Sequence, residues 1–228
     1  MERHFDEELK RLKEKLLQMA DLSQEMIGLA VRSLVRRQTS FAEETLTVEE
    51  TVNRLEIEIE EEVIRLIARM QPAAKDLRLL TATLKITNDL ERVADQACNI
   101  AETALRLLKE PPLKPLVDVP NMAALSQRMI KNSLDAFVNH DPALAKKVCE
   151  DDDQVDRLNR QIFRDLLAAM TEDKRNVIRA VDLILVSRNL ERIADLATNI
   201  GEEVIFIEEG KNIKHHVLDR AEDRPAAP

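Results

Sequence analysis

The sequence predicts an all-α protein of six helices that form two tandem, similar antiparallel three-helix bundles. Aromatic residues make up only 2% of the 228 residues and glycines number three, whereas charged residues reach 34%. Strong helix formers dominate such a chain, and strands would need more β-branched and aromatic residues. Apolar residues recur three and four positions apart, which is the spacing of an amphipathic helix. A long motif also returns later in the chain, which indicates a duplicated unit.

Three helices are expected in the first half of the chain. An apolar stripe predicts a first helix that ends near Arg37. Ser40 and Glu43 have the spacing of a capping box at the start of a second helix. Pro72 would end that helix, because proline cannot continue the backbone hydrogen-bond ladder. A third helix is then expected at about 74–109.

The second half repeats this order. A fourth helix is expected at about 121–139. Asp141 and Pro142 predict the start of a fifth helix, as a capping residue followed by a proline in the first turn. A sixth helix is expected at about 174–209, and Gly210 would close it.

An internal repeat sets the domain boundaries. Residues 89–102 return as residues 189–202 with nine of fourteen positions identical. Half of the eight prolines lie in one short stretch between the two copies, which we interpret as a linker. The expected parts are a first unit at 1–110, a linker at 111–120, a second unit at 121–216 and a frayed tail at 217–228.

Composition argues against several functional classes. A net charge of −9 disfavours nucleic-acid binding, because the phosphate backbone is also negative. No run of about 18 apolar residues occurs, so we expect contact with a membrane only through partners.

Cys98 and Cys149 lack a CxxC spacing and predict buried free thiols, which favours the cytoplasm. His215 and His216 are expected to be solvent-exposed. The sequence has no glycine-rich phosphate loop and no nucleophile–base pair, so we expect no enzyme activity.

Acidic side chains form a stripe on the outer face of one helix in each unit. At about 100° per residue, Glu91 and Asp95 point away from the apolar stripe of their helix. Glu191 and Asp195 repeat this arrangement in the second unit. The preceding helix of each unit adds a second polar pair with the same spacing, and these pairs are Glu49 with Asn53 and Asp152 with Asp156.

The polar pairs of each unit are predicted to lie level with each other. The centre of the first pair is 21 residues before Pro72, and the centre of the second is 21 residues after it. Adjacent helix axes lie about 8–10 Å apart, so antiparallel pairing brings the carboxylates together. Such carboxylates repel each other unless a cation lies between them, and oxygen ligands favour hard ions. The alternative interpretation is a solvated acidic surface.

The repeated motif carries a resemblance to a known family. With Leu-Glu-Arg-Val-Ala-Asp at 90–95 and Leu-Glu-Arg-Ile-Ala-Asp at 190–195, the chain resembles the PhoU family. The opening at 3–9 and the segment at 153–158 are also similar to that family. The resemblance covers residues 3–216.

The resemblance implies a regulator of phosphate uptake. Members of the family fold as two similar three-helix bundles and repress the phosphate-starvation response when phosphate is plentiful. A member would couple the ATPase subunit of a Pst-type phosphate transporter to a PhoR-type sensor histidine kinase in the cytoplasm, and would form a homodimer. Some members bind iron clusters on the surface motifs, and Mg²⁺, Mn²⁺, Ca²⁺ or Zn²⁺ are alternatives.

Carried onto this chain, the resemblance implies two metal sites. Asn53 departs from the expected carboxylate, and the loss of one anionic ligand should weaken the first site relative to the second. The first site would use Glu49, Asn53, Glu91 and Asp95, and the second would use Asp152, Asp156, Glu191 and Asp195.

Three functional hypotheses remain open at this point. The first is an adaptor that regulates by binding two membrane-associated partners without catalytic turnover. The second is a carboxylate-bridged metal enzyme, but that class needs Glu-x-x-His motifs that point into a bundle core, and none occurs here. The third is a structural helical scaffold, which would not explain the level acidic pairs in both units.

Overall fold

The computed structural model describes residues 2–113 and 116–210, so His215, His216 and the predicted tail lie outside the described residues. Within the described ranges there are six α-helices, one short 3₁₀-helix and no strand, which confirms the predicted fold class. The helices are α1 (Glu2–Arg36), α2 (Thr39–Met70), α3 (Ala74–Leu107), α4 (Asp118–Asn139), α5 (Pro142–Glu172), η1 (Lys174–Asn176) and α6 (Val177–Glu209).

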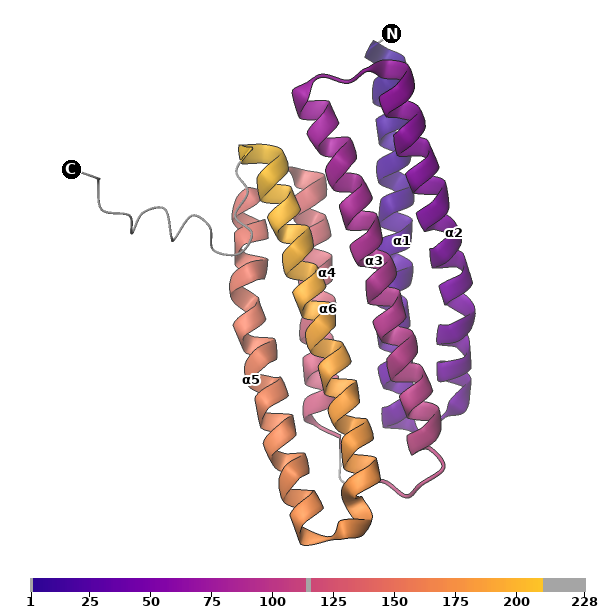
Figure 1. The fold of residues 1–228 in the computed structure, drawn as a ribbon, viewed down its shortest axis with the longest axis vertical. Coiled ribbons are helices and arrows are strands. Elements are labelled where there is room, and N and C mark those ends of the chain that lie inside the picture. The colour runs from indigo at the N-terminus through magenta and orange to yellow at the C-terminus, as the bar shows by residue number, and fades with distance from the viewer. Residues whose placement is uncertain (1, 114–115, 211–228) are drawn as a thin grey trace, which may run out of the picture.

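The six helices form two antiparallel three-helix bundles that pack side by side. Helices α1, α2 and α3 form the first bundle, and α4, α5 and α6 form the second. The bundles meet chiefly through α3 and α6, which run in opposite directions, and also through α1 and α4 behind them (Figure 1). One face of the molecule therefore presents α5, α6, α3 and α2 in that order.

The same hydrogen bond holds the first and last helix together in both bundles. The hydroxyl of Ser23 donates to the carbonyl of Leu90 at 3.2 Å, and the hydroxyl of Ser126 donates to the carbonyl of Leu190 at 3.1 Å. Both serines are fully buried, so each bond satisfies a polar group inside the core. The two bundles are therefore similar in detail as well as in helix order.

Two of the predicted caps are confirmed. The Asp141 carboxylate accepts hydrogen bonds from the backbone N–H groups of Ala143 and Leu144 at 3.0 Å each, at the start of α5. Gly210 follows α6 with a φ of 69°, in the left-handed region that glycine adopts at low cost.

The predicted capping box is wrong. Helix α2 begins at Thr39, so Ser40 already lies in the first helical turn. The residue before the helix is Gln38, whose side chain makes no capping hydrogen bond. The backbone therefore enters α2 without the side-chain acceptor that Ser40 and Glu43 suggested.

Two predicted helix starts are shifted. Helix α4 begins at Asp118, three residues earlier than expected, and it includes Pro120 in its first turn. A proline is tolerated there because the first N–H groups of a helix have no intrahelical partner. Helix α6 begins three residues later than expected, after η1, where Asp173 accepts a hydrogen bond from the Arg175 N–H at 2.9 Å.

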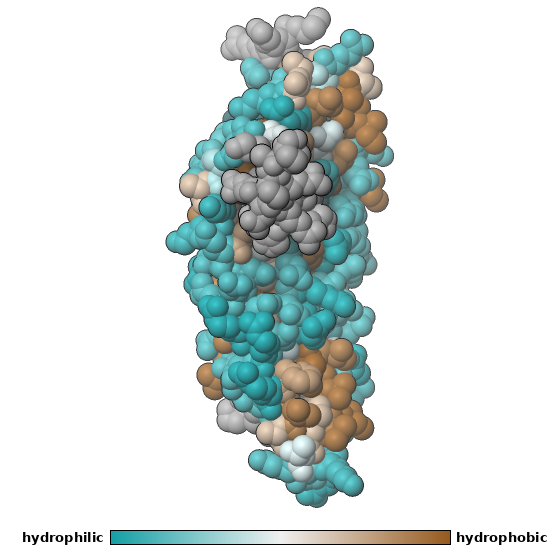
Figure 2. Space-filling model, turned by 60° about the vertical axis from the view of Figure 1, so that its left-hand side comes forward, coloured by the Kyte–Doolittle hydropathy of each residue, from teal (hydrophilic) through white to brown (hydrophobic). Residues whose placement is uncertain are grey.

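Ion pairs cross the boundary between the bundles. Lys85 of α3 contacts Glu203 of α6 at 3.1 Å. Arg106 of α3 bonds to Asp182 of α6 at 3.1 Å. The face shown in Figure 2 is mostly hydrophilic along the middle of the molecule, with apolar side chains gathered towards both ends.

Candidate functional site

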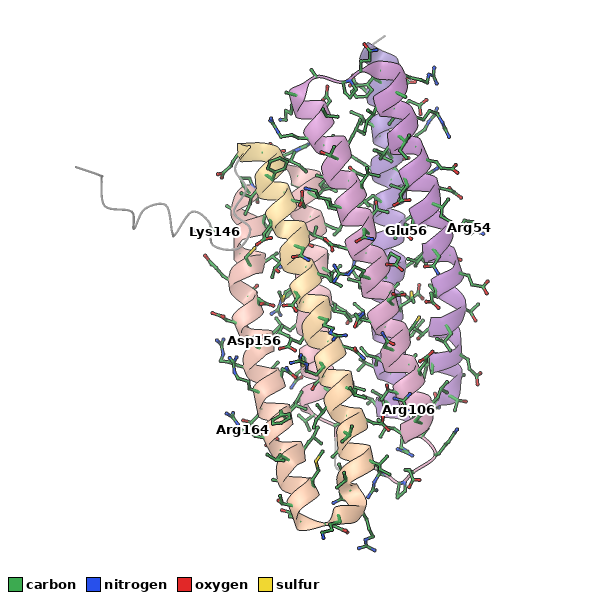
Figure 3. The ribbon with its side chains drawn as sticks, viewed as in Figure 1. Arg54, Glu56, Arg106, Lys146, Asp156 and Arg164 are labelled. Atoms are coloured by element: carbon green, nitrogen blue, oxygen red, sulfur yellow. The ribbon has the colours of Figure 1, made fainter. Side chains whose placement is uncertain are left out.

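Four carboxylates gather where α2 packs against α3. Burial raises the pKa of Glu91 to about 7, and the negative charges of three neighbouring carboxylates add to that shift. Glu91 is half-buried on α3, and Glu56 projects from α2 on the face shown in Figure 3. The hairpin thus brings the acidic side chains of both helices together. We call this group the first acidic cluster, and it consists of Glu49, Glu56, Glu91 and Asp95.

Glu56 was not among the residues predicted from the sequence. Asn53, which was predicted, is exposed one turn earlier on α2. The residues of α5 that match Asn53 and Glu56 in the repeat are Asp156 and Asn159. The carboxylate and the amide have therefore exchanged places between the units, and each unit keeps the same number of carboxylates. A residue-by-residue alignment of α2 with α5 would have revealed this exchange.

The second acidic cluster lies at the equivalent place between α5 and α6. Burial raises the pKa of Asp152 to about 6, and the charges of Asp195 and Asp156 contribute next. Burial also raises the pKa of Asp195, followed by the charge of Glu191. This cluster contains all four residues predicted for it, namely Asp152, Asp156, Glu191 and Asp195.

Arginines contact carboxylates of the second cluster, whereas the corresponding arginine of the first unit contacts a carboxylate outside its cluster. Arg160 bonds to Asp156 at 3.1 Å, and Arg188 contacts Glu191 at 3.3 Å. In the first unit, Arg92 contacts Asp89 at 3.3 Å, outside the cluster. The second cluster is therefore partly neutralised by its own chain.

Both cysteines lie beside the clusters as free thiols. Cys98 is buried, as predicted, and burial together with the nearby Glu49 raises its pKa. Cys149 is only half-buried, which corrects the prediction, and burial and the charges of Glu202 and Asp152 raise its pKa to about 11. Both thiols stay protonated near neutral pH, so the carboxylates are the main candidate ligands.

The donor atoms of the two clusters suit a hard cation, but the positions of these side chains do not yet form a coordination site. Their donors are carboxylate oxygens, which suit Mg²⁺, Mn²⁺, Ca²⁺ or ferric iron. Burial, followed by the neighbouring negative charges, raises the pKa of Glu91 and of Asp152, so their ionised forms are unfavourable in the clusters. However, within the part of the chain that the structure describes, no three His, Cys, Asp or Glu side chains are placed to hold one ion. Binding would require these side chains to rotate towards a common point.

Comparison with known proteins gives consistent matches over both units. A family model described as the PhoU domain matches residues 16–104 and 119–204. A PhoU homolog of Aquifex aeolicus, described as a phosphate-specific transport system accessory protein, is 43% identical over 216 residues, which is 94% of this chain and 98% of that protein.

Solved structures agree with this match. The crystal structure of PhoU from Pseudomonas aeruginosa has a TM-score of 0.88 at 36% identity and covers 91% of this chain and 100% of that chain. The phosphate transport system regulatory protein PhoU from Streptococcus pneumoniae has a TM-score of 0.84 at 25% identity and covers 92% of this chain and 99% of that chain.

In the described part of the chain, none of the helices has the length and apolar character needed to span a bilayer.

Proposed function

Because this chain belongs to the PhoU family, we propose that it is an accessory protein of a phosphate-specific transport system that represses the phosphate-starvation response. The observation that supports this most is the match of both helical units to the PhoU domain and to relatives described as phosphate-specific transport system accessory proteins. In this proposal the chain acts in the cytoplasm as a homodimer, without catalytic turnover. It couples the ATPase subunit of a Pst-type transporter to a PhoR-type sensor histidine kinase.

The proposal includes cation binding at the two acidic clusters. Each cluster joins the last two helices of its bundle, so an ion there would fix those helices relative to each other. Mg²⁺, Mn²⁺, Ca²⁺ and iron suit the oxygen donors better than Zn²⁺, which prefers nitrogen and sulfur. Glu56 supplies the carboxylate that Asn53 lacks, so a weaker first site is not required by the ligand count. The ligands would be Glu49, Glu56, Glu91 and Asp95 in the first cluster, and Asp152, Asp156, Glu191 and Asp195 in the second.

A binding experiment tests the regulatory role. The purified chain would be captured on the kinase cytoplasmic region and, separately, on the ATPase subunit, at high and at low phosphate. We expect recovery on at least one partner to change with phosphate, and Asp152→Asn/Asp195→Asn to alter it. Glu61→Gln/Glu172→Gln is the matched control, because both acids are exposed and lie outside the clusters. Equal recovery under all conditions and with all variants would argue against the proposal.

A further inference from the structure

Large apolar side chains are exposed on the part of the second bundle nearest the α5–α6 turn. Phe163 and Leu167 on α5 are 49% and 48% exposed, and Val181 on α6 is 44% exposed. Ile184 lies beside Phe163 in the groove between the two helices. The space-filling view, which brings the α5 side forward, shows this apolar surface at the lower end of the molecule (Figure 2). Exposed apolar patches of this kind commonly mark sites of protein interaction.

Three arginines border this apolar surface. Arg160 and Arg164 of α5 and Arg188 of α6 line the same groove as Phe163 and Ile184. Figure 3 shows Arg164 reaching out from α5. Arg160 and Arg188 contact the carboxylates of the second acidic cluster, but both are exposed, so these pairs contribute little stability and are open to exchange. We call this surface the α5–α6 groove. Its lining is Asn159, Arg160, Phe163, Arg164, Ile184, Arg188 and Glu191. The exposed Leu167 and Val181, one helical turn from Phe163 and Ile184, extend its apolar part towards the α5–α6 turn.

The first bundle keeps an apolar side chain at the equivalent place, with the exposed Ile64 at the position of Leu167, but it lacks the arginines. The positions on α2 that match Arg160, Phe163 and Arg164 hold Ile57, Glu60 and Glu61. The position on α3 that matches Arg188 holds Asn88. Because the two bundles are otherwise similar, this difference in charge is not a consequence of the fold. It gives the second bundle a basic, apolar groove where the first has an acidic surface.

We propose that the α5–α6 groove docks an acidic amphipathic helix of a partner protein. Apolar side chains of such a helix would cover Phe163 and Leu167, and its carboxylates would bond to the arginines, in the manner of a helix that lies in an apolar groove. This inference rests on the proposed function, because it assigns the surface through which the chain meets one of its protein partners.

A membrane surface fits the groove less well. Anionic headgroups would be attracted by the three arginines. They would also be repelled by the second acidic cluster, which lies next to the arginines on both helices, and by the net charge of −9. A single helix avoids this repulsion, since it can place its acidic residues on the arginines and end before the cluster. A second copy of this chain offers acidic residues on α2, and that occupant is one outcome of the test.

The test measures the affinity of the full chain for the purified ATPase subunit and for the kinase cytoplasmic region. Arg160→Gln/Arg164→Gln is expected to weaken binding to one of them by about tenfold or more, because hot-spot arginines dominate such interfaces. Phe163→Ser should weaken the same interaction. The control is Arg54→Gln/Arg65→Gln on the exposed side of α2, which removes the same charge and should leave the affinity within about twofold. Circular dichroism would confirm that each variant is folded.

A photo-crosslinking residue, p-benzoylphenylalanine, in place of Leu167 then identifies the occupant. The expected product joins position 167 to a partner segment that has net negative charge and apolar residues three and four positions apart. The inference is overturned if the crosslinked segment is basic, if it belongs to a second copy of this chain, or if the arginines mediate binding to phosphatidylglycerol vesicles instead. It is also overturned if wild type binds a partner and Arg160→Gln/Arg164→Gln binds it equally well, which leaves the proposed function intact. If wild type binds neither partner, the proposed function fails and this inference fails with it.

Discussion

Glu203 of α6 accepts hydrogen bonds from the ammonium group of Lys85 of α3 through both of its carboxylate oxygens, each at 3.1 Å. Glu203 is only 1% exposed, and this partner from the other bundle offsets part of the cost of burying its charge. The ammonium group also lies over the ring of Phe206, at 5.5 Å from its centre. The contact therefore joins the two bundles at a point where an uncompensated charge is costly.

Removal of this lysine should destabilise the chain. We expect Lys85→Ala to lower the free energy of unfolding by about 1–3 kcal/mol, because the buried Glu203 loses a charged hydrogen-bond donor. Lys146→Ala, at an exposed position on α5, should change it by less than about 0.5 kcal/mol. Urea unfolding followed by circular dichroism measures both. Equal stability of the two variants would show that the pair contributes nothing.

The pH dependence of stability should report on Glu91. Its pKa rises from the ordinary 4.5 to about 7 in the folded chain. The folded state therefore binds this proton more tightly than the unfolded state, and the contribution of Glu91 to stability falls as pH rises from about 4.5 to about 7. Glu91→Gln should accordingly gain stability relative to wild type between pH 5 and pH 8, as measured by urea unfolding at both values. Glu61→Gln, at an exposed site, should show no such trend.

Metal binding should depend on Glu56 more than on Asn53. We expect Mn²⁺ to raise the melting temperature, and more at pH 8 than at pH 6, since protons compete for the same carboxylates. In Asp152→Asn/Asp195→Asn, which keeps only the first cluster, Glu56→Gln should weaken Mn²⁺ binding in calorimetry. Asn53→Ala in the same background should have a smaller effect, because Asn53 is exposed and carries no charge. A larger loss of Mn²⁺ binding in Asn53→Ala than in Glu56→Gln would support Asn53, the ligand predicted from the sequence, in place of Glu56.

Helix capping gives a matched pair of variants. Asp141→Ala should lower the free energy of unfolding by about 1 kcal/mol, because two N–H groups at the start of α5 lose their acceptor. Ser40→Ala should change it by less than about 0.5 kcal/mol, since Ser40 lies inside the first turn of α2 rather than at its cap. Thermal unfolding followed by circular dichroism distinguishes them. A larger loss for Ser40→Ala would contradict the observed start of α2.

Periodicity and the internal repeat were sufficient to predict the helices and their pairing. The apolar spacing marks buried faces, and the symmetric distances about Pro72 place Glu49 near Glu91 across the hairpin. Helix starts were less predictable, because Pro120 serves both as a linker residue and as a first-turn residue. Glu56 was missed because the expected motif spacing pointed to Asn53.

The α5–α6 groove could not be predicted from spacing alone. Arg160 and Arg188 lie 28 positions apart in the sequence and belong to different helices. Only the packing of α5 on α6 brings their side chains to one groove. Exposed apolar residues such as Phe163 also resemble core residues in a periodic pattern, so their role is visible only once burial is known.

The two contacts from Arg160 to Asp156 and from Arg188 to Glu191 make the groove and the second acidic cluster competitors for the same guanidinium groups. A cation that takes over these carboxylates releases the arginines towards the groove. An acidic helix that takes the arginines leaves the carboxylates to the cation. If both proposed ligands bind, thermodynamic reciprocity requires each to tighten the other by the same factor, so ion occupancy and partner affinity would rise and fall together.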